Sequence, residues 1–190
     1  MAPDPDLLQR LRARDPSTLA AIVQEHARPL YRTACGMGFE QSEAEDLVQD
    51  VFATFLSTLD NFQGLSQVRT WLFGILHNKL RERRRALQRE ETFDPADAAF
   101  DALFTAYGHW ISPLEDLQRM LESREIGRIL NTCLALLPLQ QREAFLLREV
   151  EGFTSEEICK NLEVSVTHLG VLIHRARHRL RECMKRKGLS

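Results

Sequence analysis

The side chains best suited to a specific chemistry lie in a short loop and in the basic helix predicted to follow it. Phe62 stands in a loop marked by Gly64, and from residue 68 apolar residues recur at three- and four-residue steps, which predicts a helix with one apolar face. The other face carries Thr70, His77, Asn78, Arg81, Arg84 and Arg85. Cationic side chains bind phosphate oxygens, and an aromatic ring stacks on an unpaired base. The stretch at 61–85 therefore indicates a surface for single-stranded nucleic acid.

A simpler interpretation of this helix stays open at this point. A surface helix with solvated charges has the same pattern, and Trp71, on the apolar stripe, suits a packed core. The charge distribution favours binding. The 190-residue chain has a net charge of only −2, but basic residues concentrate at 69–89 and 175–187, on either side of an acidic segment at 90–125. This arrangement is typical of two nucleic-acid contacts joined by a linker.

A second candidate site lies near the C-terminus. Thr154 and Glu157 form a capping box that predicts a helix at 155–162, and Ser165 is the predicted N-cap of a helix at 166–185. Two helices joined by so short a turn predict a helix-turn-helix, whose last helix enters the major groove of DNA. The predicted base-contacting residues are Thr167, His168, Val171, His174 and Arg175. Val171 also fits a core position beside its apolar neighbours.

Other chemistries find little support in the sequence. Histidines and carboxylates form no catalytic triad, and no glycine-rich phosphate loop occurs, so we predict no catalytic residues, no metal, no cofactor and no small-molecule substrate. His174 and His178 share a helical face, but no cysteine or acid accompanies them. The four cysteines are widely spaced, and we interpret them as small core residues rather than as disulfide partners or metal ligands. They are Cys35, Cys133, Cys159 and Cys183.

The composition indicates where the protein works. The hydrophobic fraction of 44% suffices for packed cores, while no apolar run approaches the about 20 residues of a membrane span. The N-terminus has neither an apolar run nor a small-residue cleavage site. We therefore expect a cytoplasmic protein with reduced thiols.

Helix-start signals indicate the elements that position these sites. Asp15-Pro16 is a predicted helix start, and Ser42 to Glu45 form a predicted capping box before an apolar stripe that runs from Ala44 to Leu59. Ser112-Pro113 restarts a helix, and Pro138 ends it. Because no strand pattern occurs, the predicted fold is all-α, with two small helical domains joined by a linker. The predicted boundaries are 1–87 for the first domain, 88–118 for an acidic linker and 119–190 for the helix-turn-helix domain.

Four sequence blocks, taken in order, resemble one bacterial family. AEDLVQDVF comes first, then F-x-G-x-x-x-x-x-TWLFGI-x-x-N, then LP-x-x-x-R-x-A-F-x-LRE-x-EG-x-x-x-EEI, and finally RAR-x-x-L. This order closely resembles the extracytoplasmic-function (ECF) sigma factors, over about residues 15–87 and 120–183. Two separate motif sets at the right spacing make the resemblance specific.

The resemblance implies a protein that binds core RNA polymerase and directs promoter-specific transcription initiation. It implies that the C-terminal domain recognises the −35 element as duplex, and that the N-terminal domain captures the melted −10 strand, with Phe62 and Asn78 holding a flipped base. The implied −10 contacts are Phe62, Arg69, Asn78, Lys79, Arg81, Arg84 and Arg85. The chain departs from the family at Gly170 and Val171, where relatives usually carry a basic or hydroxyl residue.

The resemblance also implies protein partners. The acidic face of the predicted helix after Ala44 is expected to meet the β′ clamp helices of RNA polymerase, and the C-terminal domain is expected to seat on the β flap. The implied polymerase-binding residues are Glu45, Asp46, Leu47, Gln49 and Asp50. An anti-sigma factor is the expected inhibitor, and one anchored at the inner membrane would hold the protein there.

Two other functions stay open on the sequence. A stand-alone helix-turn-helix regulator would bind duplex operators as a dimer, and a metal or redox sensor would use His174, His178 and Cys183. Phe62, Asn78 and the acidic face favour the sigma factor, because a duplex binder needs none of them.

Overall fold

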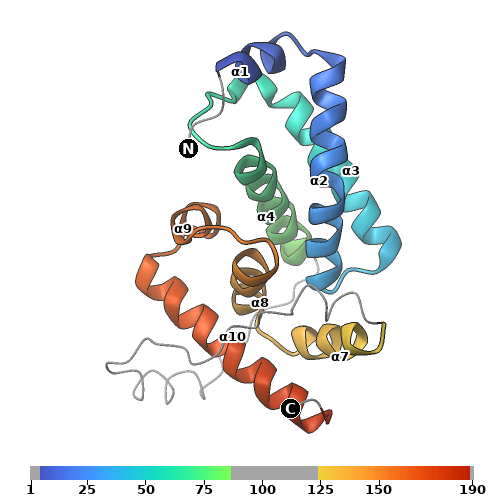
Figure 1. Ribbon diagram of the computed structural model, residues 1–190, viewed down its shortest axis with the longest axis vertical. Coiled ribbons are helices and arrows are strands. Elements are labelled where there is room, and N and C mark those ends of the chain that lie inside the picture. The colour runs from blue at the N-terminus through green and yellow to red at the C-terminus, as the bar shows by residue number, and fades with distance from the viewer. Residues whose placement is uncertain (1–4, 87–123, 189–190) are drawn as a thin grey trace.

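The regular elements in the described parts of this computed structural model, residues 5–86 and 124–188, are all helices. They form two helical domains, as predicted (Figure 1). The N-terminal domain contains α1 (Pro5–Arg12), α2 (Pro16–Gly36), α3 (Gln41–Ser57), the short 3₁₀ turn η1 (Leu59–Asn61) and α4 (Val68–Ala86). The C-terminal domain contains α7 (Arg124–Ala135), α8 (Leu139–Phe145), the π-helical turn η2 (Leu146–Val150), α9 (Ser155–Leu162) and α10 (Val166–Arg186). The predicted linker at 88–118 and the helix start at Ser112 lie outside the described residues.

Three helix starts confirm the predicted caps. The Asp15 carboxylate accepts the Thr18 N–H at 2.8 Å at the start of α2. Before α9, the Thr154 hydroxyl accepts the Glu157 N–H at 3.3 Å, and the Glu157 carboxylate accepts the Thr154 N–H at 3.0 Å. Ser165 Oγ accepts the His168 N–H at 3.1 Å at the start of α10. Each cap satisfies a backbone donor that the helix itself leaves without a partner.

The start of α3 differs from the prediction. The helix begins at Gln41, and its N-cap is Glu40 rather than Ser42. The carboxylate of Glu43 accepts the Glu40 N–H at 3.0 Å. This bond closes the first turn earlier than a capping box at Ser42 would, so the predicted capping box is wrong while the helix itself is present.

One apolar core extends through both domains. In the N-terminal domain Leu47 and Phe55 of α3 and Leu72 of α4 are buried, as the apolar stripes predicted. The same cluster continues into Leu146 of η2. Gly36, at the end of α2, lies against this leucine, and a Cβ built at Gly36 would stand 2.9 Å from Leu146 Cδ1. The absence of a side chain at Gly36 therefore lets α2 and η2 approach closely.

A disulfide joins two helices of the C-terminal domain. Cys133 of α7 and Cys183 of α10 are bonded, with their Cα atoms 5.7 Å apart, whereas Cys35 and Cys159 are free. The prediction that the cysteines are not disulfide partners was wrong for this pair. The two residues are 50 positions apart, and only the packing of α7 against α10 brings them together.

Candidate nucleic-acid interface

The first turn of α10 is open to solvent. Thr167 and His168 are exposed, while Leu169 and Leu172 turn inward and are buried. The α9-to-α10 turn is tight because Glu163 adopts a left-handed conformation with φ of 55°. The helix-turn-helix therefore exposes Thr167 and His168, the first two of the predicted base-contacting residues, and their contact with bases stays a prediction.

The second turn of α10 is less accessible. Val171, His174 and Arg175 are half-buried, so each presents only part of its side chain. Burial lowers the pKa of His174, and the nearby charges of His178, Arg177 and Arg181 lower it further. The His174 imidazole is therefore neutral at pH 7 and retains a nitrogen that can accept a hydrogen bond.

Phe62 lies inside the N-terminal domain. Its side chain is 5% exposed, and its ring stacks on Trp71 with centroids 4.6 Å apart and planes 8° apart. Trp71 in turn meets Phe55 edge to face, with centroids 5.4 Å apart. In this conformation Phe62 belongs to the core. Its predicted role as a base-stacking residue stays a prediction, and it requires the ring to move away from Trp71 or to offer an edge.

The predicted −10 contacts on α4 lie in several different environments. Asn78 is exposed and Lys79 half-buried. Arg81 lies near the C-terminal domain, with its Nη1 3.4 Å from the exposed carboxylate of Glu163. The side chains of Arg84 and Arg85 lie outside the described part of the structure.

Arg69, in the first turn of α4, faces the C-terminal domain. Its Nη2 lies 3.6 Å from Oε2 of Glu151 and donates to the backbone carbonyl of the same residue. Its guanidinium also covers the ring of Phe153, 4.2 Å from the centroid. The structure thus places a predicted DNA contact against the other domain.

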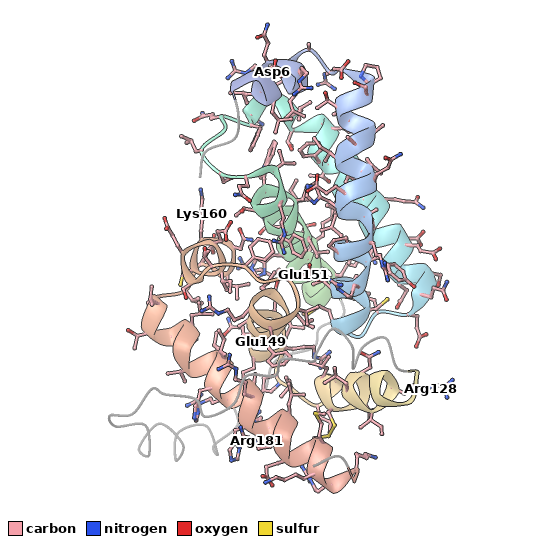
Figure 2. The ribbon with its side chains drawn as sticks, viewed as in Figure 1. Asp6, Arg128, Glu149, Glu151, Lys160 and Arg181 are labelled. Carbon is pink, nitrogen blue, oxygen red and sulfur yellow. A yellow bond between two sulfur atoms is a disulfide. The ribbon has the colours of Figure 1, made fainter. Side chains whose placement is uncertain are left out.

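Glu151 is the centre of this contact, and Figure 2 shows it where the C-terminal domain meets α2 and α4. Its side chain is only 2% exposed. Arg32 of α2 donates to Oε1 from Nε at 3.0 Å and from Nη2 at 2.8 Å, and the Thr33 hydroxyl lies 3.3 Å from the same oxygen. A buried carboxylate of one domain is therefore neutralised by groups of the other, as a buried charge requires.

Three further polar contacts join the domains. His77 Nδ1 and Glu143 Oε1 share a buried hydrogen bond of 2.6 Å. Arg142 Nη1 donates to the Met37 carbonyl at 2.9 Å.

The third contact links Thr70 to α9. The Thr70 hydroxyl lies 2.8 Å from Oε1 of Glu157. Burial alone would raise the pKa of Glu157, but hydrogen bonds from Thr154 and Thr70 outweigh it and lower the pKa below its usual value.

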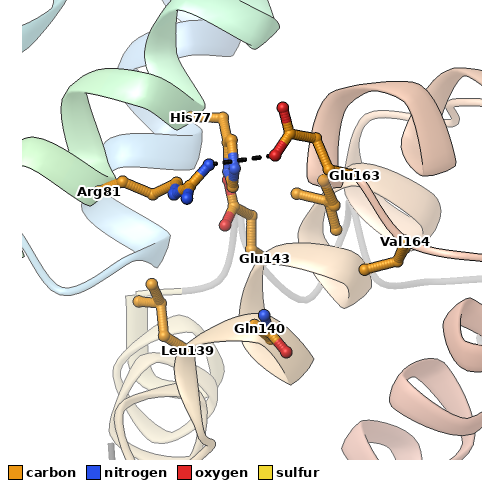
Figure 3. A pocket seen from close by; sticks show the side chains of 8 residues that line it. His77, Arg81, Leu139, Gln140, Glu143, Glu163 and Val164 are labelled. Carbon is orange, nitrogen blue, oxygen red and sulfur yellow. Dashed lines mark hydrogen bonds and ion pairs between the residues drawn. The ribbon is translucent and has the colours of Figure 1, made fainter. Parts of the chain in front are cut away.

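A pocket of about 280 Å³ lies between α4 and the C-terminal domain (Figure 3). His77 and Arg81 line it from the N-terminal domain, and Glu143 and Glu163 line it from the C-terminal domain. Its other lining residues are Leu139, Gln140, Leu162 and Val164. Within the pocket, His77 already bonds to Glu143, and Arg81 already bonds to Glu163.

The predicted polymerase-binding residues all belong to α3, and their polar members lie on the far side of the helix from the buried stripe that includes Leu47. Glu45, Asp46, Gln49 and Asp50 are exposed, and Leu47 is fully buried beneath them. Asp50 lies 3.3 Å from Arg83 of α4. The acidic surface is therefore accessible, and its role in binding polymerase stays a prediction.

The described residues show neither a metal-binding group nor a membrane-spanning helix. No group of three or more histidine, cysteine or acidic side chains is placed to hold a metal ion. In the same residues, no helix is both long enough and apolar enough to cross a membrane.

Sequence reasoning missed the residues that join the domains. Arg32 and Glu151 are charged residues that the sequence alone would place in solvent, and Thr33 lies among the buried residues of α2, beside Ala34, where a core role suffices. The burial of Glu151 arises only when the domains pack together. The one available signal was the EG pair, Glu151-Gly152, directly after η2, and this pair indicates a turn rather than a contact.

The comparisons with known proteins agree along most of the chain. The Sigma-70 region 2 family model matches residues 22–90, and the Sigma-70 region 4 model matches residues 127–180. A probable RNA polymerase sigma factor of Haemophilus influenzae is 35% identical over 153 residues, which cover 76% of this chain and 78% of that protein. RNA polymerase sigma factor NccH of Alcaligenes xylosoxydans is 30% identical, over 93% of this chain and 92% of its own.

Solved structures show the same architecture. RpoE of Bartonella quintana, in complex with the anti-sigma factor NepR, is 26% identical with a TM-score of 0.64, over 87% of this chain and 96% of that chain. CnrH, in complex with the cytosolic domain of CnrY, shares the fold at 24% identity and a TM-score of 0.68, over 94% of this chain and 95% of its own. With a region 2 domain followed by a region 4 helix-turn-helix, the chain belongs to the sigma-70 family of RNA polymerase sigma factors, in its extracytoplasmic-function class.

Proposed function

We propose that α10 recognises the −35 element as duplex and that α4, with the loop before it, captures the melted −10 strand. Core RNA polymerase carries out the catalysis, and the sigma factor itself catalyses no reaction. The observation that best supports these roles is the exposed first turn of α10, carried on a domain that matches region 4, after a domain that matches region 2. A cytoplasmic location follows from the role.

We propose that only a few side chains contact −35 bases directly. Thr167 and His168 are exposed, so their side chains can reach base edges in the major groove. Gly170 is exposed as well and offers no side chain there. We therefore expect the half-buried His174 and Arg175 to act at the edge of the groove, with DNA shape contributing to recognition.

The −10 contact is proposed to use the side of α4 that carries Asn78 and Lys79. Phe62 would contribute by an aromatic edge or by a change of rotamer, because its face is stacked on Trp71. Arg69 and Arg81 are partly exposed, and they would become fully available to DNA when the C-terminal domain moves away, since both lie at carboxylates of that domain.

Polymerase is proposed to bind the acidic surface of α3 through its β′ clamp helices, and its β flap is proposed to bind the C-terminal domain. The exposed carboxylates of Glu45, Asp46 and Asp50 over the buried Leu47 support the first contact. An anti-sigma inhibitor is proposed because the Bartonella RpoE is solved with one. The division at 1–87, 88–118 and 119–190 remains the proposed domain organisation.

Run-off transcription tests this function. Core RNA polymerase should initiate on DNA from upstream of the protein's own gene only when the protein is added. Asp46→Lys should abolish association with core, while Glu25→Lys, an equal charge change at an exposed site on α2, should not. A protein that ignores core yet binds duplex DNA tightly as a dimer would instead be a conventional helix-turn-helix regulator.

A further inference from the structure

If the domains separate, the groups that meet at Glu151 enter different surroundings. Arg32, Thr33 and Arg69 belong to the N-terminal domain, whereas the carboxylate belongs to the C-terminal domain. Separation would return Glu151 to water and would leave two guanidinium groups and a hydroxyl converging on one vacated position. These are the donors that bind an oxyanion, because the arginine fork fits a carboxylate and a phosphate equally well.

The position of this donor cluster relates it to the −10 surface. Arg69 lies in the first turn of α4, directly after the loop that carries Phe62. Arg32 lies on α2, which packs beside α4. The side chains of Arg32 and Arg69 are 35% and 33% exposed even in the closed form, so an incoming anion can reach their edges. Arg69 lies on the opposite side of α4 from Asn78, nine residues away, so a strand held at Phe62 and Asn78 would have to carry a phosphate around the N-terminal end of α4 to reach the donor cluster.

We propose that Arg32, Thr33 and Arg69 form a binding site for a phosphodiester group of the −10 strand, and that Glu151 occupies this site as a phosphate mimic in the closed form. The proposal rests on the sigma-factor function given above, and it adds Arg32 and Thr33 to the DNA surface. It also makes the closed form and the DNA-bound form mutually exclusive, because the carboxylate and the phosphate carry like charges and need the same donors.

This competition couples domain opening to DNA binding. A ligand that binds only the open state shifts the population towards it, and any change that favours the open state raises the apparent affinity for that ligand. Glu151→Gln removes the competing charge and leaves the buried core contacts in place. Arg32→Ala weakens the closed form as well, but it also removes a donor from the site. The two variants therefore open the protein alike and differ in DNA binding.

The first experiment measures opening and binding on the full-length protein. The radius of gyration from small-angle X-ray scattering reports opening, and the anisotropy of a short fluorescein-labelled oligothymidylate reports binding, since a backbone contact needs no base sequence. Glu151→Gln should enlarge the protein and tighten binding about tenfold, the gain expected when a state populated at about 10% becomes dominant. Glu156→Gln is the matched control, because Glu156 is an exposed glutamate on α9 of the same domain and the substitution removes the same charge. It should change neither quantity.

The second experiment isolates the phosphate contact. In the Glu151→Gln background, Arg32→Ala should weaken oligothymidylate binding and reduce the slope of log affinity against log salt by about 0.7, the value for one phosphate contact on a single strand. Arg28→Ala, an exposed arginine one turn earlier on α2, removes the same charge and should leave the slope unchanged. Far-UV circular dichroism of each variant checks that the helices remain.

Two results would overturn the proposal. In one, Glu151→Gln matches wild type in both size and binding. In the other, Glu151→Gln opens the protein, but Arg32→Ala in that background leaves affinity and salt slope unchanged. The contact would then only hold the domains together, and the donors would not bind a phosphate. Failure of the proposed function would look different, because wild type itself would then not support run-off transcription with core polymerase.

Discussion

Loss of the Cys133–Cys183 disulfide should lower the free energy of unfolding by about 4 kcal/mol. The bond closes a loop between positions 50 residues apart. In the chain-entropy model, a loop of that length restricts the unfolded chain by roughly 14 cal/mol/K, which is about 4 kcal/mol at 25 °C. Both cysteines are buried, so the thiols formed on reduction remain in apolar surroundings and regain little solvation.

The assay is urea unfolding followed by far-UV circular dichroism, with and without a thiol reductant. For a small protein the loss corresponds to a fall in the midpoint of about 2 M urea. The Cys133→Ala/Cys183→Ala variant should unfold at the lower midpoint in both conditions. The Cys35→Ala/Cys159→Ala variant, which lacks only the free cysteines, should keep the response to reductant.

Two observations would refute this reasoning. Alkylation and mass spectrometry of protein purified without reductant would count four free thiols if the bond does not form. Alternatively, the reductant would free the two thiols and leave the midpoint unchanged, which would mean that the packing of α7 on α10 already restricts the chain as much as the bond does.

Three further predictions concern single side chains. The pKa of Asp15 is lowered from 3.8 to about 2 by hydrogen bonds from Ser17 and Thr18, so its cap stabilises the protein fully above about pH 4 and loses that effect as the pH falls towards 2. Asp15→Asn should flatten this part of the stability curve, and an unchanged curve would contradict the assignment. Phe62→Ala should cost about 3–5 kcal/mol in urea unfolding because the ring is buried, and a loss below about 1 kcal/mol would show that the ring is free to leave the core. Arg175→Ala should weaken −35 duplex binding by about 1–3 kcal/mol if it contacts a base, and an equal loss on every sequence, measured by competition, would make it a phosphate contact.

Local chemistry explains what could be predicted from the sequence. The caps at Asp15, Thr154 and Ser165 depend on residues at most three positions away, so their patterns were sufficient. The apolar stripes of α3 and α4 depend on helical period alone. The start of α3 was misplaced because Glu40 and Ser42 are both plausible caps for the same turn.

Long-range packing explains what could not be predicted. Cys133 and Cys183 meet across 50 positions, and Arg32 meets Glu151 across 119. The helical periodicity of a sequence carries no information about contacts between residues so far apart in the chain. Arg69 illustrates the result most directly, because its predicted phosphate contact stays a prediction, while the anion beside it in this structure is a carboxylate of its own chain.

The apolar surface shared by the two domains has a consequence for synthesis. The ribosome delivers residues 5–86 well before η2, so for a time Gly36 and the surface around it lack the leucine that covers them. A nascent chain in that state exposes apolar surface, and general chaperones bind exposed apolar surfaces. A protein truncated after α4 would remain in this condition permanently, and it would depend on chaperones or be degraded.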